Sequence, residues 1–157
     1  MLDATFMETV PKRNRNKSIV CIDPGETIGL CRITDCIIEN VKQVKVKSVV
    51  DGAQAVIDYV SLMSPDWIIC EDYKVYEWES STHSWDRLHT PRLIGAIEFI
   101  SAKYFTNEIK LILRMAHEAK KFSTDEKLKA WGLYKATKGV HHGRDALRHG
   151  VFSLIFD

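Results

Sequence analysis

The sequence predicts a mixed α/β domain, in which helices pack on a sheet of parallel and antiparallel strands. Three apolar runs separated by short gaps open the chain, and such spacing is typical of an antiparallel meander. Helical patterns then alternate with further apolar runs, which favours parallel pairing through helical crossovers. The length of 157 residues, with 45% hydrophobic and 27% charged residues, suits one globular domain.

Several protein classes are excluded by composition. No apolar run approaches the roughly 20 residues that a membrane span needs. Residues 1–20 contain no continuous apolar core of the kind found in secretory signals, and the chain is too short for a two-lobed ATPase or kinase. The four cysteines form no Cys-x-x-Cys pair, which argues against a zinc finger and favours reduced thiols. We therefore expect a cytoplasmic protein.

Charge is unevenly distributed along the chain. The net charge is +1, but residues 107–157 alone carry +4. This excess is compatible with a basic patch for nucleic acid, or with a well-mixed solvated surface. Residues 1–17 include the basic run 12–17 and are expected to form a flexible arm, which either touches phosphates or is a solvated tail. Residues 18–157 are expected to form the domain.

The first three strands are predicted from apolar, β-branched runs. The first run spans residues 18–22 and ends at Asp23, after which Pro24 and Gly25 break the strand. The next two runs cover residues 28–33 and 37–46. A helix should follow, because Ala53, Val56, Ile57 and Val60 recur at helical spacing.

The second half of the chain alternates strands and helices. Residues 67–70 form an uninterrupted apolar run typical of a strand buried on both faces, followed by a polar and aromatic segment at 72–89. Thr90 and Pro91 predict a helix start, and the broad apolar stripe of that helix could serve a second subunit as well as the core. The remaining elements are a strand at 109–113, a short helix after a capping box at 123–126, and a last helix at about 140–155.

Two predicted strands end in a carboxylate. Asp23 follows the first strand, and Glu71 follows the strand at 67–70. If these strands run parallel, both carboxylates emerge at the same sheet edge, where their mutual repulsion is relieved by a divalent metal. The alternative is that the two acids are unrelated and each caps a turn.

The last helix favours the metal site. His142 and Asp145 are spaced i, i+3 near its start, and His149 lies on the same face one turn later. Three carboxylates and a histidine at one sheet edge are typical of a two-metal phosphodiester site.

Three motifs in this order resemble one known family. Their sequences are Ile22-Asp23-Pro24-Gly25-Glu26-Thr27-Ile28-Gly29, Trp67-Ile68-Ile69-Cys70-Glu71 and His142-Gly143-Arg144-Asp145-Ala146-Leu147-Arg148-His149. Together they resemble RuvC-like Holliday junction resolvases of the phage type, in the RNase H-like superfamily. The resemblance covers residues 18–155.

The resemblance implies a fold, an activity and a set of site residues. The fold would be an RNase H-like mixed five-stranded sheet flanked by helices. The activity would be paired nicking of four-way DNA junctions by a homodimer that uses Mg²⁺, with Mn²⁺ able to substitute, in a prokaryotic or phage-infected cell. Asp23, Glu71 and Asp145 would be catalytic metal-binding carboxylates, and His142 stands where many members have a fourth acid and some have histidine.

Six further residues are candidate DNA contacts. Each has a simpler interpretation: the lysines could form a solvated turn, the arginines could neutralise the acids, and the tyrosines could cover the core or a dimer contact. They are Lys120, Lys121, Arg144, Arg148, Tyr73 and Tyr76.

The hypothesis drawn from the sequence is a metal-dependent endonuclease selective for branched DNA. One alternative is an RNase H-like nuclease acting on RNA or on flaps, and another is a branched-DNA binding protein that does not cleave. The intact acidic triad argues against the second alternative, because a protein that only binds DNA has no need of converging carboxylates.

Overall fold

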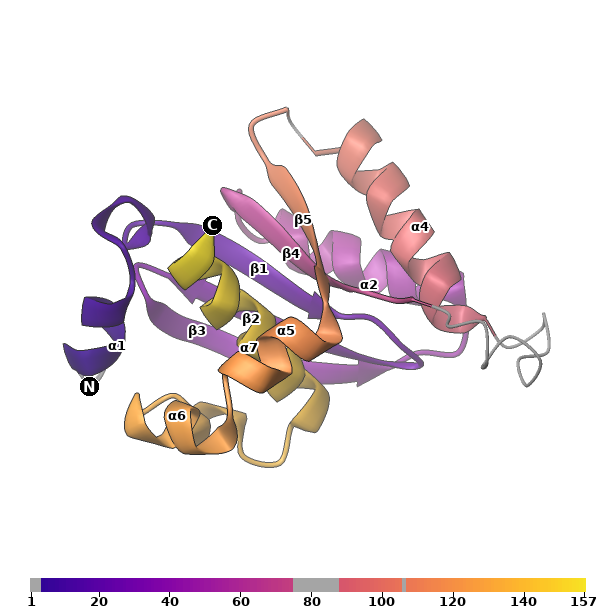
Figure 1. Cartoon of the computed structure of the whole chain (residues 1–157). Coiled ribbons are helices and arrows are strands. Elements are labelled where there is room, and N and C mark those ends of the chain that lie inside the picture. The colour runs from indigo at the N-terminus through magenta and orange to yellow at the C-terminus, as the bar shows by residue number, and fades with distance from the viewer. Residues whose placement is uncertain (1–3, 75–87, 106) are drawn as a thin grey trace.

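The computed structural model describes residues 4–74, 88–105 and 107–157, and it contains one five-stranded mixed sheet (Figure 1). The strand order is β3-β2-β1-β4-β5. The strands are β1 (Ser18–Asp23), β2 (Thr27–Thr34), β3 (Ile37–Lys45), β4 (Trp67–Asp72) and β5 (Lys110–Met115). β1, β2 and β3 pair antiparallel, whereas β4 pairs parallel with both β1 and β5. The predicted fold class and all five strands are confirmed.

A two-residue loop, Asp35 and Cys36, joins β2 to β3. Asp35 and Cys36 have φ values of 51° and 63°, in the left-handed region. A two-residue hairpin needs this conformation because its twist must match that of the flanking strands. Here it is reached without glycine.

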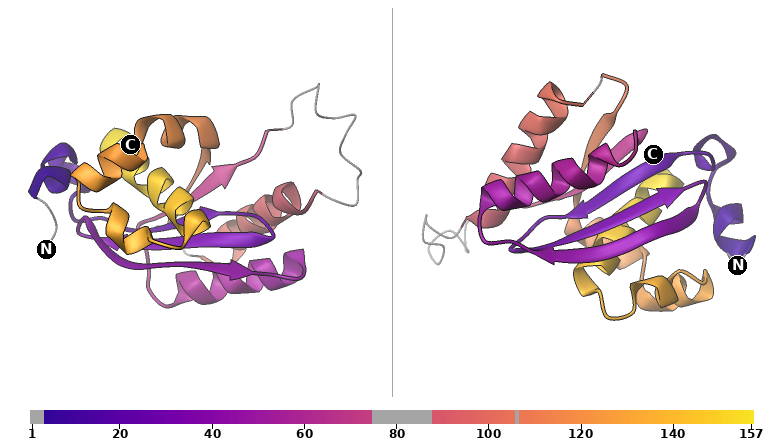
Figure 2. Two further views of the ribbon diagram at one scale, coloured as in Figure 1. Left: turned by 90° about the horizontal axis from the view of Figure 1, so that it is seen from below. Right: turned by 180° about the vertical axis from the view of Figure 1, so that it is seen from behind.

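Helices cover both faces of the sheet (Figure 2). α2 (Val49–Ser61) and α4 (His89–Lys103) pack on one face. The other face carries α5 (Ala116–Phe122), α6 (Asp125–Ala130), the 3₁₀ turn η3 (Tyr134–Thr137) and α7 (His141–Phe156), and α1 (Ala4–Thr9) lies at its edge. Among the described residues, no helix is long and apolar enough to cross a membrane.

The strand pleat decides which face each residue of β1 serves. Ile19 and Cys21 pack with α7, whereas Val20 and Ile22 pack beneath α2 and α4. Because successive side chains of a strand point to opposite faces, Asp23 belongs to the α7 face.

Glycines let α7 lie directly on the sheet. A Cβ atom on Gly29 of β2 would overlap the carbonyl oxygen of His142, and one on Gly150 of α7 would overlap Sγ of Cys21. Gly143 of α7 makes a similarly close approach to β3. The missing side chains therefore allow the start of α7 to reach the end of β1.

The segment expected to be a flexible arm is folded against the domain in its described part, residues 4–17. It forms α1 and the 3₁₀ turn η1 (Lys12–Asn14). Phe6 and Val10 are fully buried, and Nδ2 of Asn14 donates to the carbonyl of Leu154 at 2.9 Å. These two apolar residues, four positions apart, anchor the segment.

Two local predictions also differ from the structure. Residues 116–122 form helix α5, which was not predicted from the sequence, so the alternative interpretation of Lys120 and Lys121 as a solvated turn is wrong. The cap of α6 is Thr124 rather than Ser123, because the Thr124 hydroxyl accepts from the backbone N–H of Lys127.

Candidate active site

The carboxylates at the ends of β1 and β4 lie side by side. In the parallel pairing of these strands, Ile22 is opposite Cys70, and the next residues are Asp23 and Glu71. In β4, Ile69 belongs to the α7 side of the core, so the pleat directs Glu71 to that side as well. The sequence prediction that both acids share one edge is confirmed.

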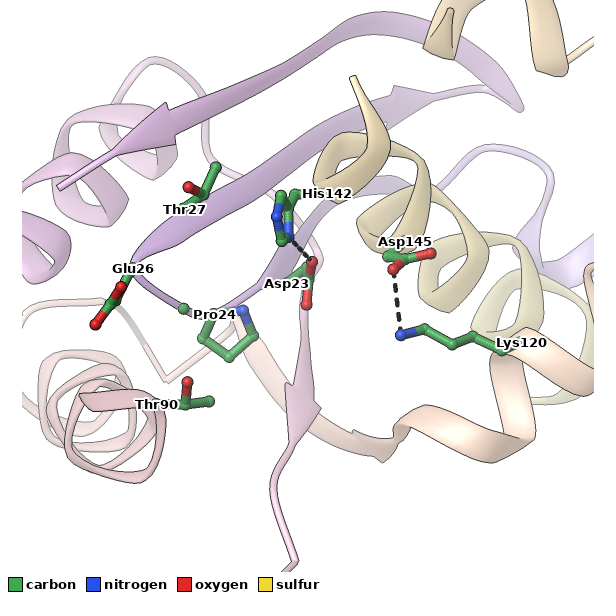
Figure 3. A pocket seen from close by; sticks show the side chains of 9 residues that line it. Asp23, Pro24, Glu26, Thr27, Thr90, Lys120, His142 and Asp145 are labelled. Atoms are coloured by element: carbon green, nitrogen blue, oxygen red, sulfur yellow. Dashed lines mark hydrogen bonds and ion pairs between the residues drawn. The ribbon is translucent and has the colours of Figure 1, made fainter. Parts of the chain in front are cut away.

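α7 brings two further side chains to this edge (Figure 3). Nδ1 of His142 lies 3.0 Å from Oδ2 of Asp23, and Asp145 follows one turn along the helix. These residues line an open pocket of about 460 Å³. The full lining is Asp23, Pro24, Gly25, Glu26, Thr27, Thr90, Lys120, His142 and Asp145.

Burial and neighbouring acids both act on the carboxyl group of Asp23. Its side chain is nearly buried, and its pKa is raised from 3.8 to about 6. Burial is the largest cause, and the charges of Glu71 and Asp145 add to it, while the hydrogen bond to His142 acts in the opposite direction. Three carboxylates at this edge therefore repel one another and favour a cation between them.

Lys120 of α5 places its ammonium group among these acids. Its Nζ lies 3.2 Å from Oδ2 of Asp145 and 3.8 Å from Oε2 of Glu71. Burial works against its charge, but the charges of Glu71 and Asp145 outweigh burial and raise the pKa of Lys120. The site thus already stabilises a positive charge.

The side chains fit a hard divalent cation in their chemistry. In the present arrangement, the described part of the chain contains no group of three or more His, Cys, Asp or Glu side chains that would hold a metal ion. Even so, the carboxylates of Asp23, Glu71 and Asp145 supply the oxygen ligands that Mg²⁺ and Mn²⁺ prefer, and His142 adds an imidazole nitrogen. The repulsion at Asp23 is what a bound divalent cation would relieve.

Sequence comparisons find no matching family model and no matching curated protein. Solved structures do match. Thermus thermophilus RuvC in complex with a Holliday junction substrate is 13% identical with a TM-score of 0.68, over 89% of this chain and 94% of that chain. The yeast mitochondrial Holliday junction resolvase is 13% identical (TM-score 0.59, 90% and 78%), and the fowlpox virus Holliday junction resolvase is 12% identical (TM-score 0.54, 87% and 97%).

The chain has the RNase H-like fold of RuvC. At 12–13% identity, the match concerns the fold, and the argument for the site depends on the side chains of this chain.

Within this RuvC-like fold, Arg148, a candidate DNA contact, pairs with one of the acids, which agrees with the alternative interpretation that it neutralises them. Its Nη1 is 2.6 Å from Oδ1 of Asp145, and its Nε donates to the carbonyl of Ser123 at 3.1 Å. It also forms an ion pair with Asp125 of α6. Arg148 therefore holds Asp145 in place and links α7 to α6.

Arg144 is placed differently from the sequence prediction of a DNA contact. Its side chain is buried, donates from Nε to the hydroxyl of Thr137 at 3.1 Å, and stacks 4.3 Å from the ring of Tyr134. Its Nη1 lies 3.5 Å from Asp125. The guanidinium group thus connects η3, α6 and α7 and does not face a ligand site.

The remaining predicted contacts lie around the pocket or outside the described residues. Lys121 is exposed on α5, next to Lys120. Tyr73, partly exposed, lines a second pocket of about 280 Å³ that also contains Glu71. Tyr76 lies outside the described residues.

One residue of the site was not assigned from the sequence. Nε2 of His149 lies 2.8 Å from Oε2 of Glu71, and the imidazole is fully buried. The available signal was its position four residues after Asp145, on the same face of α7.

Proposed function

We propose that this protein is a Mg²⁺-dependent endonuclease that resolves four-way DNA junctions by paired nicking as a homodimer, with Mn²⁺ able to substitute. The observation that carries the proposal is the convergence of Asp23, Glu71 and Asp145 around a stabilised positive charge. It occurs on a fold shared with Holliday junction resolvases. The proposed place of action is the cytoplasm of a prokaryotic or phage-infected cell.

Each side chain of the site has a role in this proposal. Bound divalent cations would supply the Lewis acidity that activates water and stabilises the leaving oxygen. Asp23, Glu71, Asp145 and His142 would hold them, and the contact of His142 with Asp23 sets the relative position of these two ligands. Lys120 offers its ammonium to the scissile phosphate, and it can release the acids when they bind metal.

Outside the acidic centre, we assign two DNA contacts and leave one as an expectation. Lys121 would contact a phosphate, since it is exposed beside Lys120. Tyr73 would stack on an unpaired base, because its pocket adjoins Glu71. The same role is expected of Tyr76 from the sequence.

A cleavage assay on matched substrates tests the function. A synthetic four-way junction, a linear duplex of equal length, a flap and an RNA–DNA hybrid are each incubated with Mg²⁺, Mn²⁺ or EDTA. We expect symmetric nicks in the junction with either metal and none with EDTA. Asp23→Asn, Glu71→Gln and Asp145→Asn should each lower the rate by orders of magnitude while junction binding persists.

Other outcomes would support the alternative functions. Faster cutting of flaps or hybrids would indicate a nuclease of different selectivity. Tight junction binding with no cutting in either metal would indicate a branched-DNA binding protein. Binding should also weaken steeply with salt, because phosphate contacts release counterions.

A further inference from the structure

His149 is a buried polar group at the back of the acidic centre. Its side chain has no exposed surface, and it lies on α7 one turn after Asp145. Within the described part of the chain, its polar contact runs from Nε2 to Oε2 of Glu71, at 2.8 Å. The side chain of Glu71 remains 19% exposed, so the pair joins the core to the pocket.

Hydrogen bonding assigns the proton on this ring. Nδ1 of His149 is buried without a hydrogen-bond partner among the described residues. A charged imidazolium would bury an Nδ1–H group with no acceptor, which is costly. The neutral form with its proton on Nε2 leaves only an unprotonated nitrogen at the unpartnered position, and its Nε2–H donates to the carboxylate of Glu71.

The same contact limits how Glu71 can move. A glutamate side chain has three rotatable torsions, and fixing them costs entropy whenever the carboxylate must bind in one orientation. A fully buried imidazole has little conformational freedom, so it fixes the position of Oε2 of Glu71 before a cation binds. Lys120 approaches that same oxygen from the pocket at 3.8 Å and is 42% exposed, so it is the more mobile of the two partners.

We propose that His149 is a positioning residue that orients Glu71 for the divalent cation and does not itself bind the cation. The nitrogen that faces the site is engaged with Oε2 of Glu71, and the other ring nitrogen is buried, so the ring acts on the cation through Glu71. That the cation serves DNA cleavage rests on the proposed function. The effect of His149 on cation affinity can be measured without any DNA substrate. Outer-shell partners of this kind usually change metal affinity about 10- to 100-fold when they are removed.

Three variants of the full chain separate donation from packing. His149→Gln keeps an N–H donor at a similar reach, His149→Leu keeps a similar volume without a donor, and Ser153→Ala changes another fully buried residue of α7. Mn²⁺ binding is measured by calorimetry without DNA, and unfolding midpoints establish that each variant is folded. We expect the Leu variant to bind Mn²⁺ about 10- to 100-fold more weakly. The Gln and Ala variants should stay close to wild type.

A coupling measurement completes the test. In a Glu71→Gln background, His149→Leu should cause no further loss of Mn²⁺ affinity, because its effect passes through the carboxylate. Nitrogen NMR of the wild-type ring should show the proton on Nε2. Unchanged Mn²⁺ affinity in a folded Leu variant, or equal losses in the Leu and Gln variants, would overturn the proposal. A chain that binds Mn²⁺ as described but cuts no junction would refute the proposed function and leave the role of His149 intact.

Discussion

Oδ2 of Asp23 and Nδ1 of His142 lie 3.0 Å apart, although the two residues are 119 positions apart in the chain. The contact joins the end of the first strand to the first turn of the last helix. The site therefore depends on how α7 is seated on the sheet as well as on which side chains it contains.

Asp23 should make the metal-free protein less stable as pH rises. Its folded pKa of about 6 exceeds the ordinary 3.8, so the folded state binds a proton that the unfolded chain has released. The resulting stabilisation is complete below about pH 4 and is lost as pH rises through about 6, a change of at most about 3 kcal/mol. In EDTA, Asp23→Asn should therefore be more stable than wild type at pH 7.5 but not at pH 4. Thermal unfolding at both pH values measures this, and the same difference at both would contradict it.

His142 should tolerate a carboxylate better than the loss of its side chain. An aspartate can bind the cation from the same helix position, whereas an alanine cannot. His142→Asp should keep measurable Mg²⁺-dependent cleavage, and His142→Ala should lose most of it. The neighbouring His141→Ala is a control for the first turn of α7. Wild-type cleavage by His142→Ala would remove His142 from the site.

Removing the Lys120 charge should strengthen metal binding. The ammonium group competes with an incoming cation for Asp145 and Glu71. Lys120→Met should raise Mn²⁺ affinity by up to about fivefold, the equivalent of about 1 kcal/mol for a partly exposed ion pair. Lys121→Met, the adjacent exposed position of α5, should leave Mn²⁺ affinity unchanged. Calorimetry on both variants tests this, and weaker binding by Lys120→Met would show that the lysine organises the acids instead.

Gly29 should accept no side chain. A Cβ atom there overlaps the backbone of His142, so Gly29→Ala must displace the start of α7. We expect a loss of about 3 kcal/mol in unfolding free energy together with loss of cleavage. Gly95→Ala is the matched control, because its Cβ atom meets nothing within 4 Å and it lies inside α4. The Gly95→Ala variant should gain about 0.5–1 kcal/mol in unfolding free energy. Denaturant unfolding of both variants shows whether steric overlap with α7 causes the loss in Gly29→Ala.

The dimer should form through two exposed aromatic side chains, one on α4 and one at the residue that caps its C-terminus. Phe99 and Tyr104 are 58% and 72% exposed and make an edge-on ring contact with each other, while the rest of the apolar stripe is used within the domain. Replacing both by glutamate should give a folded monomer in sedimentation at micromolar concentration. Val50→Glu, at a 76% exposed position of α2, should leave the dimer intact. A wild-type chain that sediments as a monomer would refute the prediction.

The sheet and its two terminal acids could be predicted because the signals are local. An apolar run ending in a carboxylate identifies a buried strand and the place where it leaves the core, as at Asp23 and Glu71. Helix α2 returns the chain from β3 to the other side of β1, so β4 runs parallel to β1 and pairs with it. The i, i+3 spacing of His142 and Asp145 likewise requires only one helix.

The other features depend on contacts between distant segments. Charged residues are exposed by default, so the burial of Arg144 becomes evident only when Asp125, Thr137 and Tyr134 surround it. Similarly, nothing in the sequence around Lys120 indicates that its ammonium group lies between two acids. α5 has only seven residues, too few for a clear apolar period.

The seating of α7 also determines when the site can exist during synthesis. Asp23 and Glu71 belong to strands that emerge early from the ribosome, whereas His142, Asp145 and His149 belong to residues 141–156. A nascent chain ending before residue 141 can pair β1 with β4, but it lacks the third carboxylate and both histidines. It consequently carries two adjacent acids, and the centre is complete only after residues 141–156 have packed on the sheet.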